Sequence, residues 1–386
     1  MHLLEPSTPE ETAEQLRECA SRKQTIRLGG RESKSSMAGP IQAADVMLST
    51  RNLRKVLLYE PRDLTVSVEA GCPFSELQSL LAQNGQMIAL DPPFSGEASI
   101  GGIAASNCSG PMRRAYGTAR DLVIGMKFAT LEGKFVQAGG MVVKNVAGLD
   151  MAKIMIGSFG TLAAITSLNF RLHSLPAGTE TYLYSRPDFE QALEKRSCIL
   201  KSVLQPVAID LLSPALALRF GLRGHVLAIR VAGPENLLAR YRSEFNGAER
   251  LAESEDHTFW SGIQEFTPNF LAEHREGVVA RVSTTLGGIG SLPKTVAGAF
   301  IARAAAGVSY FYFPGWNAMA PWWRKIEEQG LTAVIEHAPE DIRAKENLWS
   351  GPRTAPANEA FVMMEKIKRM FDSNCLLNRK RLYGRI

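Results

Sequence analysis

A glycine-rich stretch from about Asp91 to Thr166 constrains this chain more than any other feature of its sequence. Its densest part runs Asp91-Pro92-Pro93, Ala98-Ser99-Ile100-Gly101-Gly102-Ile103-Ala104-Ala105-Ser106-Asn107 and Ser109-Gly110-Pro111. Glycine lets several backbone N–H groups converge closely on one anion, because no Cβ intrudes. Ser99, Ser106 and Asn107 add side-chain donors. We therefore interpret the stretch as a diphosphate-binding loop rather than a simple turn, although the pattern alone does not name the ligand.

Two further glycine turns and one mixed polar segment are weaker signals. Gly157-Ser158-Phe159-Gly160 opens a predicted strand and Gly29-Gly30 follows another, and a simple turn explains each equally well. The run from Lys144-Asn145 to Asp150 offers donors that would stabilise the charge of a reduced flavin ring, but a surface loop with Asp150 as a helix cap explains it too. The fingerprints G-x-G-x-x-G and G-x-x-x-x-G-K-[ST] do not occur, which argues against a Rossmann or P-loop site.

Composition excludes several classes of function. A net charge of +5 is too small for a dense nucleic-acid-binding surface. The five cysteines are scattered, and no two of the six histidines stand at ligand spacing, so we predict neither a disulfide framework nor a metal site. No G-x-S-x-G hydrolase elbow is present. The N-terminus lacks a signal-peptide pattern, so we expect a cytoplasmic protein without direct membrane insertion, which reaches a membrane only through partners.

The length of 386 residues favours two domains, because single cores rarely extend beyond about 250–300 residues. The patterns predict a helix capped by Thr8 and strands over 24–28, 64–70 and 161–172. Pro176-Ala177-Gly178 marks a domain boundary. Candidate strands at 226–231, 278–282 and 308–313, with helices between them, predict an α+β second domain on an antiparallel sheet. The tryptophan-rich segment around Trp322 suits core packing better than a pocket or a protein interface.

The ordered motifs resemble the FAD-binding domain of the vanillyl-alcohol oxidase and p-cresol methylhydroxylase superfamily, and within it a family of flavin-binding subunits of bacterial glycolate oxidases. The resemblance is strong from about residue 24 to 176, weak in the second domain, and returns at Phe371-Asp372 and Asn378. The matching segments are Pro92-Pro93-Phe94-Ser95-Gly96-Glu97, Gly110-Pro111-Met112-Arg113, Arg120-Asp121-Leu122-Val123-Ile124-Gly125, Lys144-Asn145-Val146-Ala147-Gly148 and Gly157-Ser158-Phe159-Gly160.

This resemblance implies an α+β fold: a two-subdomain FAD-binding domain of the p-cresol methylhydroxylase type over 1–176, and a smaller α+β cap or substrate domain over 177–356. A C-terminal helix and tail, 357–386, would return to the first domain. The resemblance also implies that Asn378 reaches toward the flavin ring. The residues that it assigns to FAD are Gly29, Gly30, Arg31, Pro93, Ser99, Ile100, Gly101, Gly102, Ser106, Asn107, Gly110, Lys144, Asn145, Gly160, Ile165 and Asn378.

Departures from the family pattern bear on the cofactor and on catalysis. Arg31-Glu32 stand where the family's first loop commonly has another glycine, and Asn378-Arg379-Lys380-Arg381 replaces its Asn-Pro-Gly-Arg ending. The position that carries a flavin-linking histidine in some relatives has none here, so the expected FAD is non-covalent. The histidine-rich metal and substrate motif of the related catalytic flavoprotein has no counterpart, and no acid–base residue is evident.

The implied function is an FAD-binding oxidoreductase subunit of a glycolate oxidase complex, which oxidises a 2-hydroxy acid and passes electrons to an iron–sulfur partner. A second flavoprotein subunit is the other expected partner. Two alternatives stay open at this point. The chain is either a non-catalytic subunit that holds flavin as a scaffold, or a stand-alone FAD-dependent oxidase of an alcohol or lactone.

Overall fold

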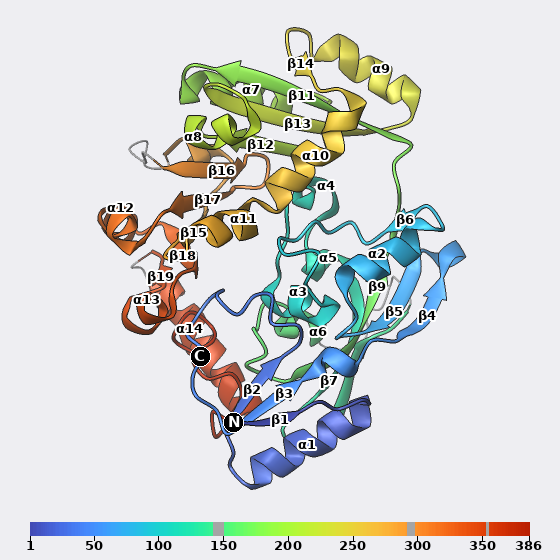
Figure 1. Cartoon of the computed structure of the whole chain (residues 1–386), viewed down its shortest axis with the longest axis vertical. Helices are drawn as coiled ribbons and strands as arrows, with labels where there is room; N and C mark the ends of the chain where they lie inside the picture. The colour runs from blue at the N-terminus through green and yellow to red at the C-terminus, as the bar shows by residue number, and fades with distance from the viewer. Residues whose placement is uncertain (142–149, 292–297, 353–354) are drawn as a thin grey trace.

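The computed structural model describes residues 1–141, 150–291, 298–352 and 355–386. Two bodies lie one above the other in Figure 1, the N-terminal one built on two sheets and the other on one large sheet. The first contains β1 (His2–Leu4), α1 (Pro9–Ser21), β2 (Ile26–Gly29), β3 (Val46–Ser49), β4 (Val56–Glu60), β5 (Thr65–Glu69), α2 (Phe74–Ala82), β6 (Gln86–Met87), α3 (Ile100–Ser106), α4 (Arg113–Tyr116), α5 (Ala119–Leu122), β7 (Val123–Ala129), β8 (Phe135–Gly139), α6 (Ala152–Met155), β9 (Ala164–Arg171) and β10 (His173–Ser174).

The first body combines a parallel and an antiparallel sheet. Strands β1, β3 and β2 pair in that order as a parallel sheet, and β4-β5-β9-β7-β8 form an antiparallel one. Helix α1 begins as predicted, because the Thr8 hydroxyl accepts a hydrogen bond from the Glu11 N–H at 3.1 Å. It buries Leu16 and Cys19 against β2 and β3. The two sheets and α3 between them form the walls of the cleft described below.

The second body is a nine-stranded sheet in which every pair is antiparallel, in the order β14-β11-β13-β12-β16-β17-β15-β18-β19. The elements of this part of the chain are β11 (Gly178–Arg186), α7 (Phe189–Lys201), β12 (Ala208–Leu212), α8 (Pro214–Ala217), β13 (His225–Gly233), α9 (Glu235–Glu244), β14 (Glu249–Arg250), α10 (Glu253–Gln264), α11 (Phe266–Glu273), β15 (Val278–Ser283), β16 (Ala299–Arg303), β17 (Val308–Phe313), α12 (Trp316–Glu328), β18 (Thr332–His337), α13 (Glu340–Lys345) and β19 (Trp349–Ser350), and the last helix, α14 (Ala355–Phe371), follows them. The predicted fold class, an FAD-domain-like α+β body followed by an antiparallel α+β body, is confirmed. Trp322 and Trp323 are buried on α12, in the core.

The chain returns to its first body at the C-terminus. Helix α14 lies beside β2 and β3 in Figure 1, and the Phe371 ring contacts Phe128 of β7. After the helix, Leu377 pairs in parallel with Ile26 of β2. The tail therefore adds to the sheet edge that borders the cleft. The predicted boundaries at 176 and 356 stay predictions, although they fall near β10 and near the start of α14.

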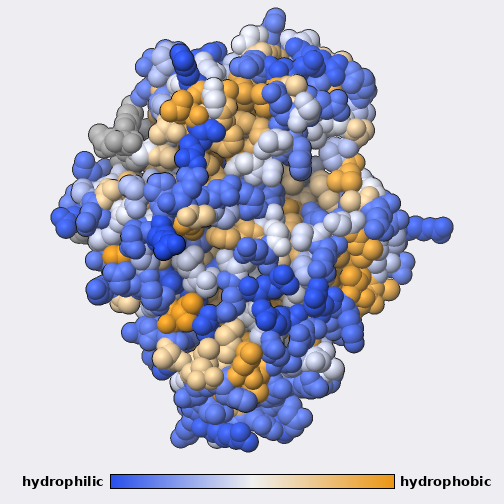
Figure 2. Space-filling view, in the orientation of Figure 1, coloured by the Kyte–Doolittle hydropathy of each residue, from blue (hydrophilic) through white to orange (hydrophobic). Residues whose placement is uncertain are grey.

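Strand β4 is one of the two edge strands of the five-stranded sheet. Its residues Val56, Leu57 and Leu58 are the longest uninterrupted run of exposed large aliphatic side chains among the residues that the structure describes. They contribute to the apolar patch at the right edge of Figure 2. Within the described ranges, no helix is long and apolar enough to cross a bilayer.

Candidate functional site: a cationic cleft beside α3

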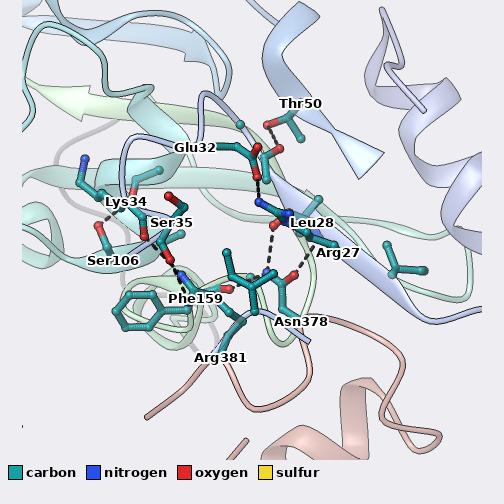
Figure 3. Close-up of a pocket in the computed structure, with 18 of the residues that line it drawn as sticks. Arg27, Leu28, Glu32, Lys34, Ser35, Thr50, Ser106, Phe159, Asn378 and Arg381 are labelled. Atoms are coloured by element: carbon teal, nitrogen blue, oxygen red, sulfur yellow. Dashed lines mark hydrogen bonds and ion pairs between the residues drawn. The ribbon is translucent and has the colours of Figure 1, made fainter. Parts of the chain in front are cut away.

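A cleft of about 1050 Å³, its open mouth included, lies between the loop after β2, helix α3 and the C-terminal tail. Figure 3 shows Lys34 and Ser35 from the loop, Ser106 and Phe159 from the far wall, and Asn378 and Arg381 from the tail around it. Its wall consists of Ile26, Arg27, Leu28, Gly29, Gly30, Arg31, Glu32, Ser33, Lys34, Ser35, Ile41, Gln42, Ala43, Ala44, Thr50, Ser99, Gly101, Gly102, Ala105, Ser106, Phe159, Gly160, Ala163, Ile165, Asn378, Arg379 and Arg381. Three segments that are distant in sequence thus build one site.

Helix α3 begins at the cleft because Ser99 caps it. The Ser99 hydroxyl accepts a hydrogen bond from the Gly102 N–H at 3.2 Å. A Cβ on Gly30 would lie 2.8 Å from the same hydroxyl, and a Cβ on Gly101 would lie 2.9 Å from the Ala70 carbonyl oxygen. Glycine at position 30 therefore allows the loop after β2 to approach Ser99, and glycine at position 101 allows α3 to pack against Ala70, after β5. The absence of a Cβ at Gly30 and Gly102 leaves room in the cleft for a bulky anion such as a pyrophosphate.

The charge of the cleft wall suits an anionic ligand. Its ionisable side chains are five cations and a single acid: Arg27, Arg31, Lys34, Arg379, Arg381 and Glu32. Glu32 already forms an ion pair with Arg27. Lys34 has no acidic partner within 4.0 Å among the described residues, and burial lowers the pKa of its ammonium group. The cleft therefore holds uncompensated positive charge that a diphosphate would neutralise.

Asn378 fastens the tail to the cleft wall. Its amide nitrogen donates to the carbonyl oxygens of Leu28 at 3.0 Å and Phe159 at 2.8 Å, and its side-chain oxygen accepts from the Leu28 N–H at 2.7 Å. Both amide hydrogens are thus used on the backbone. Gly160, at φ +68, follows Phe159 and brings this turn within reach. The side chain lines the cleft, and its hydrogen bonds hold strand β2 and the turn at Phe159 together.

We expect Asn378→Ala to lower the free energy of unfolding by about 2–4 kcal/mol, because three hydrogen bonds to the backbone are lost at roughly 1 kcal/mol each. FAD affinity should fall with it, since Leu28 and Phe159 both line the cleft. Urea unfolding and FAD titration measure the two effects. Asn378→Asp keeps the acceptor and removes the donors, so it should fall between the alanine variant and the wild type.

Ten of the sixteen residues predicted for the cofactor line this cleft: Gly29, Gly30, Arg31, Ser99, Gly101, Gly102, Ser106, Gly160, Ile165 and Asn378. Four described ones do not. Ile100 is 2% exposed and packs in the core, and Pro93 is partly buried outside the cleft wall. Asn107 ends α3 next to the cleft, and its side-chain oxygen is buried without a hydrogen-bond partner in the described structure. That oxygen is free to accept a hydrogen bond from a ligand.

Gly110 is a glycine for a structural reason. A Cβ there would lie 2.0 Å from the Asp91 carbonyl oxygen, and its N–H donates to the Asp91 carboxyl at 2.9 Å. The same carboxyl accepts from the Met112 N–H at 2.8 Å, and burial raises the pKa of Asp91 to about 7. The Asp91-Pro92-Pro93 motif therefore clamps the loop after α3. The remaining two predicted residues, Lys144 and Asn145, lie outside the described residues.

Sequence reasoning missed most of the loop after β2 and the end of the tail. Lys34, Ser35 and Arg381 line the cleft but belong to no motif that predicts binding. Arg381 donates to the carbonyl oxygens of Lys34 at 3.3 Å and Ser35 at 3.4 Å, so the tail orders the loop. The available signal is the cation and serine content of Arg31-Glu32-Ser33-Lys34-Ser35, which as a pattern indicates only a departure from the family's glycine.

The inner face of the nine-stranded sheet carries a row of buried polar groups toward the first body. Arg281 lies directly opposite Tyr310, and Asp210 directly opposite Arg303, so by register all four share one face. Arg303 and Asp210 both act electrostatically on Asp91 across the junction. Among the described residues, no group of three or more His, Cys, Asp and Glu side chains could hold a metal ion.

Comparisons with known proteins agree with this cleft. A family model described as a FAD binding domain matches residues 2–139. The glycolate oxidase subunit GlcE of Escherichia coli (strain K12) is 30% identical over 253 residues, which are 65% of this chain and 67% of that protein. The D-lactate dehydrogenase (cytochrome), mitochondrial, of Arabidopsis thaliana is 30% identical over 234 residues, or 60% of this chain and 39% of that protein. The D-2-hydroxyglutarate dehydrogenase of Xanthomonas citri pv. viticola is 32% identical over 168 residues, 43% and 35% of the two chains.

The solved structures that resemble this one include an alkyldihydroxyacetonephosphate synthase, with a TM-score of 0.74 at 18% identity over 97% of this chain and 75% of that one. This likeness concerns the fold. The two glycine approaches, the free side-chain oxygen of Asn107 and the cationic wall fit the cofactor of the matched family. The chain therefore belongs to the family of FAD-binding oxidoreductases that includes the glycolate oxidase subunit GlcE, and FAD is its cofactor.

Proposed function

We propose that this chain is the FAD-carrying subunit of a multi-subunit enzyme of the glycolate oxidase type, which oxidises a 2-hydroxy acid such as glycolate. The observation that carries the proposal is the shared chemistry in the names of its relatives. Glycolate, D-lactate and D-2-hydroxyglutarate all have a hydroxyl on the carbon next to a carboxylate. The chain spans about two thirds of GlcE and little more than a third of the two dehydrogenases, so substrate and partners are part of the proposal.

Within this reaction, the chain's residues would hold the cofactor. The cations of the wall would bind the pyrophosphate, Gly30 and Gly102 would leave room for it, and Asn107 would offer its unpaired oxygen to a donor of the ligand. Bound FAD supplies a two-electron acceptor. The 2-hydroxy acid would give up two electrons and two protons to become the 2-oxo acid, and the electrons would leave to an iron–sulfur subunit. A second flavoprotein subunit would complete the complex.

A second candidate function is a flavin-holding subunit that does not itself oxidise the acid. The observation that favours it is the ion pair between Arg281 and Glu336, 3.2 Å apart, because this cation at the domain junction already has a carboxylate partner. In this version, the substrate would be oxidised on the other flavoprotein subunit.

The test is co-purification of the chain with its partners from the native host, followed by an absorption spectrum of the purified complex. We expect flavin bands together with the broad visible absorption of iron–sulfur clusters, and reduction of the flavin by glycolate or D-lactate. A colourless chain that cannot be reconstituted with FAD, or a flavoprotein that purifies alone and is active alone, would contradict the proposal. Denaturation should release the flavin into the supernatant, because the expected FAD is non-covalent.

A further inference from the structure

Three arginines lie on the inner face of the nine-stranded sheet, and each has a carboxylate partner. Arg230 lies 2.7 Å from Asp256, Arg281 lies 3.2 Å from Glu336, and Arg303 pairs with Asp210. A buried arginine without such a partner would be costly, so paired charges alone need no functional explanation. The three pairs differ in the fraction of their side chains that is exposed to solvent.

The Arg303–Asp210 pair is sealed, with 9% and 1% of its side chains exposed. The Arg281–Glu336 pair is more open, at 26% and 11%, although it also lies at the junction of the two bodies. Arg281 uses its Nε on Glu336 and one terminal nitrogen on the Ser283 hydroxyl at 3.2 Å. The Arg281 side chain is the most exposed of the three arginines, and Glu336 occupies one side of its guanidinium.

This pair is connected to the wall of the FAD cleft through neighbouring contacts. The loop that carries Lys34 continues into Ala38, whose N–H donates to the Glu336 carbonyl oxygen at 2.7 Å. The Arg281 guanidinium also contacts the Tyr383 hydroxyl, and the Tyr383 ring packs on Phe159 of the cleft wall, with centroids 5.9 Å apart. A molecule held by Arg281 would therefore lie beside the cofactor site.

We propose that Glu336 is a built-in counter-ion that occupies the carboxylate-binding side of Arg281, so that the free chain does not bind a 2-hydroxy acid beside its flavin. The ligand class comes from the proposed function. An arginine fork binds one carboxylate well, and a second carboxylate at the same nitrogen meets the charge of the first. Removal of the Glu336 charge leaves the fork open to a carboxylate from solution.

The test uses the full chain loaded with FAD, at constant ionic strength and pH 8, and follows the flavin absorption spectrum during titration with glycolate. The wild type is expected to show no saturable change. Glu336→Gln keeps the size of the side chain and removes its charge. This variant should bind glycolate with an affinity at least roughly tenfold above the weakest that the titration of the wild type could detect, because one charged hydrogen bond is gained. Ethylene glycol, which lacks the carboxylate, should leave both spectra unchanged.

Two variants control the interpretation. Asp210→Asn removes the charge of the sealed pair and should gain no glycolate binding. Arg281→Gln combined with Glu336→Gln should lose whatever binding the single Glu336→Gln variant gained. Saturable glycolate binding by the wild type overturns the proposal. The titration of the wild type does not depend on the variant, so it tests the proposal even if the Glu336→Gln protein does not retain FAD. A folded, FAD-loaded Glu336→Gln protein that ignores glycolate overturns it as well.

This experiment and the co-purification can fail separately. The titration reads binding of a carboxylate by the isolated chain, whereas the co-purification reads partners and substrate oxidation in the complex. An active complex whose FAD-carrying chain binds glycolate in the wild-type form would refute the role of Glu336 and leave the proposed function intact.

Discussion

Asp372→Ala is expected to lower the free energy of unfolding by about 3–5 kcal/mol, because it leaves a buried ammonium group without its counter-ion. The side chains of Lys368 and Asp372 are 6% and 0% exposed and lie 2.6 Å apart. The Lys368 ammonium also donates to the carbonyl oxygens of Thr161 at 2.7 Å and Leu377 at 2.9 Å. Asp372 accepts from the Leu377 N–H at 2.7 Å, so its loss frees the tail as well as the helix.

FAD binding should weaken in the same variant, since Leu377 pairs with Ile26 of β2 and positions Asn378. The matched control is Glu244→Ala in α9, where Arg240 and Glu244 have the same spacing, lie 3.9 Å apart and are about half exposed. An exposed pair of this kind contributes about 0.3–0.5 kcal/mol. Urea unfolding of the three proteins compares them, and equal losses for the two variants would show that burial does not govern the Lys368–Asp372 pair.

Gly101→Ala and Gly102→Ala should separate folding from cofactor binding. At Gly101 a Cβ would lie 2.8 Å from the Ala70 Cβ and 2.9 Å from its carbonyl oxygen, so we expect a loss of about 1–3 kcal/mol in unfolding free energy. At Gly102 the only side-chain atom of the described residues within 4 Å is the Ser99 hydroxyl at 3.1 Å, so a small shift of that side chain makes room for the methyl group and keeps the cap. Because alanine favours the helix by roughly 0.5–1 kcal/mol, Gly102→Ala should keep its stability.

FAD affinity is expected to fall in both variants, for different reasons. Gly101→Ala moves α3 away from β5, whereas Gly102→Ala places a methyl group in the cleft that the cofactor's phosphates approach. We expect the Gly102→Ala protein to bind FAD at least roughly tenfold more weakly with an unchanged melting temperature of the FAD-free protein, since one close charged hydrogen bond is worth about 1.5–3 kcal/mol. If the Gly102→Ala protein bound FAD with wild-type affinity, α3 would not be part of the pyrophosphate site.

Prediction from the sequence succeeded where the constraint was local. The Thr8 cap, the strand over 308–313 and the buried tryptophans of α12 follow from residue types at short spacing, and all appear in the structure. The sequence did not distinguish glycines that line the cleft from glycines that only make room for a neighbouring backbone. Gly102 and Gly110 belong to one motif, yet only Gly102 lines the cleft, while Gly110 leaves room for Asp91. Their difference depends on which backbone lies opposite each glycine.

By itself, the sequence predicted a diphosphate-binding loop in the glycine-rich segment, because the space that glycines leave around the backbone is a local property. Only the tertiary structure brought Lys34, Ser106 and Arg381 around that segment and Glu336 onto Arg281. Some of those contacts join residues that are hundreds of positions apart in the sequence. The pattern of residue types along the chain does not predict which of these side chains come into contact. The physical reason is that charge pairing and cleft shape depend on distances across the folded chain.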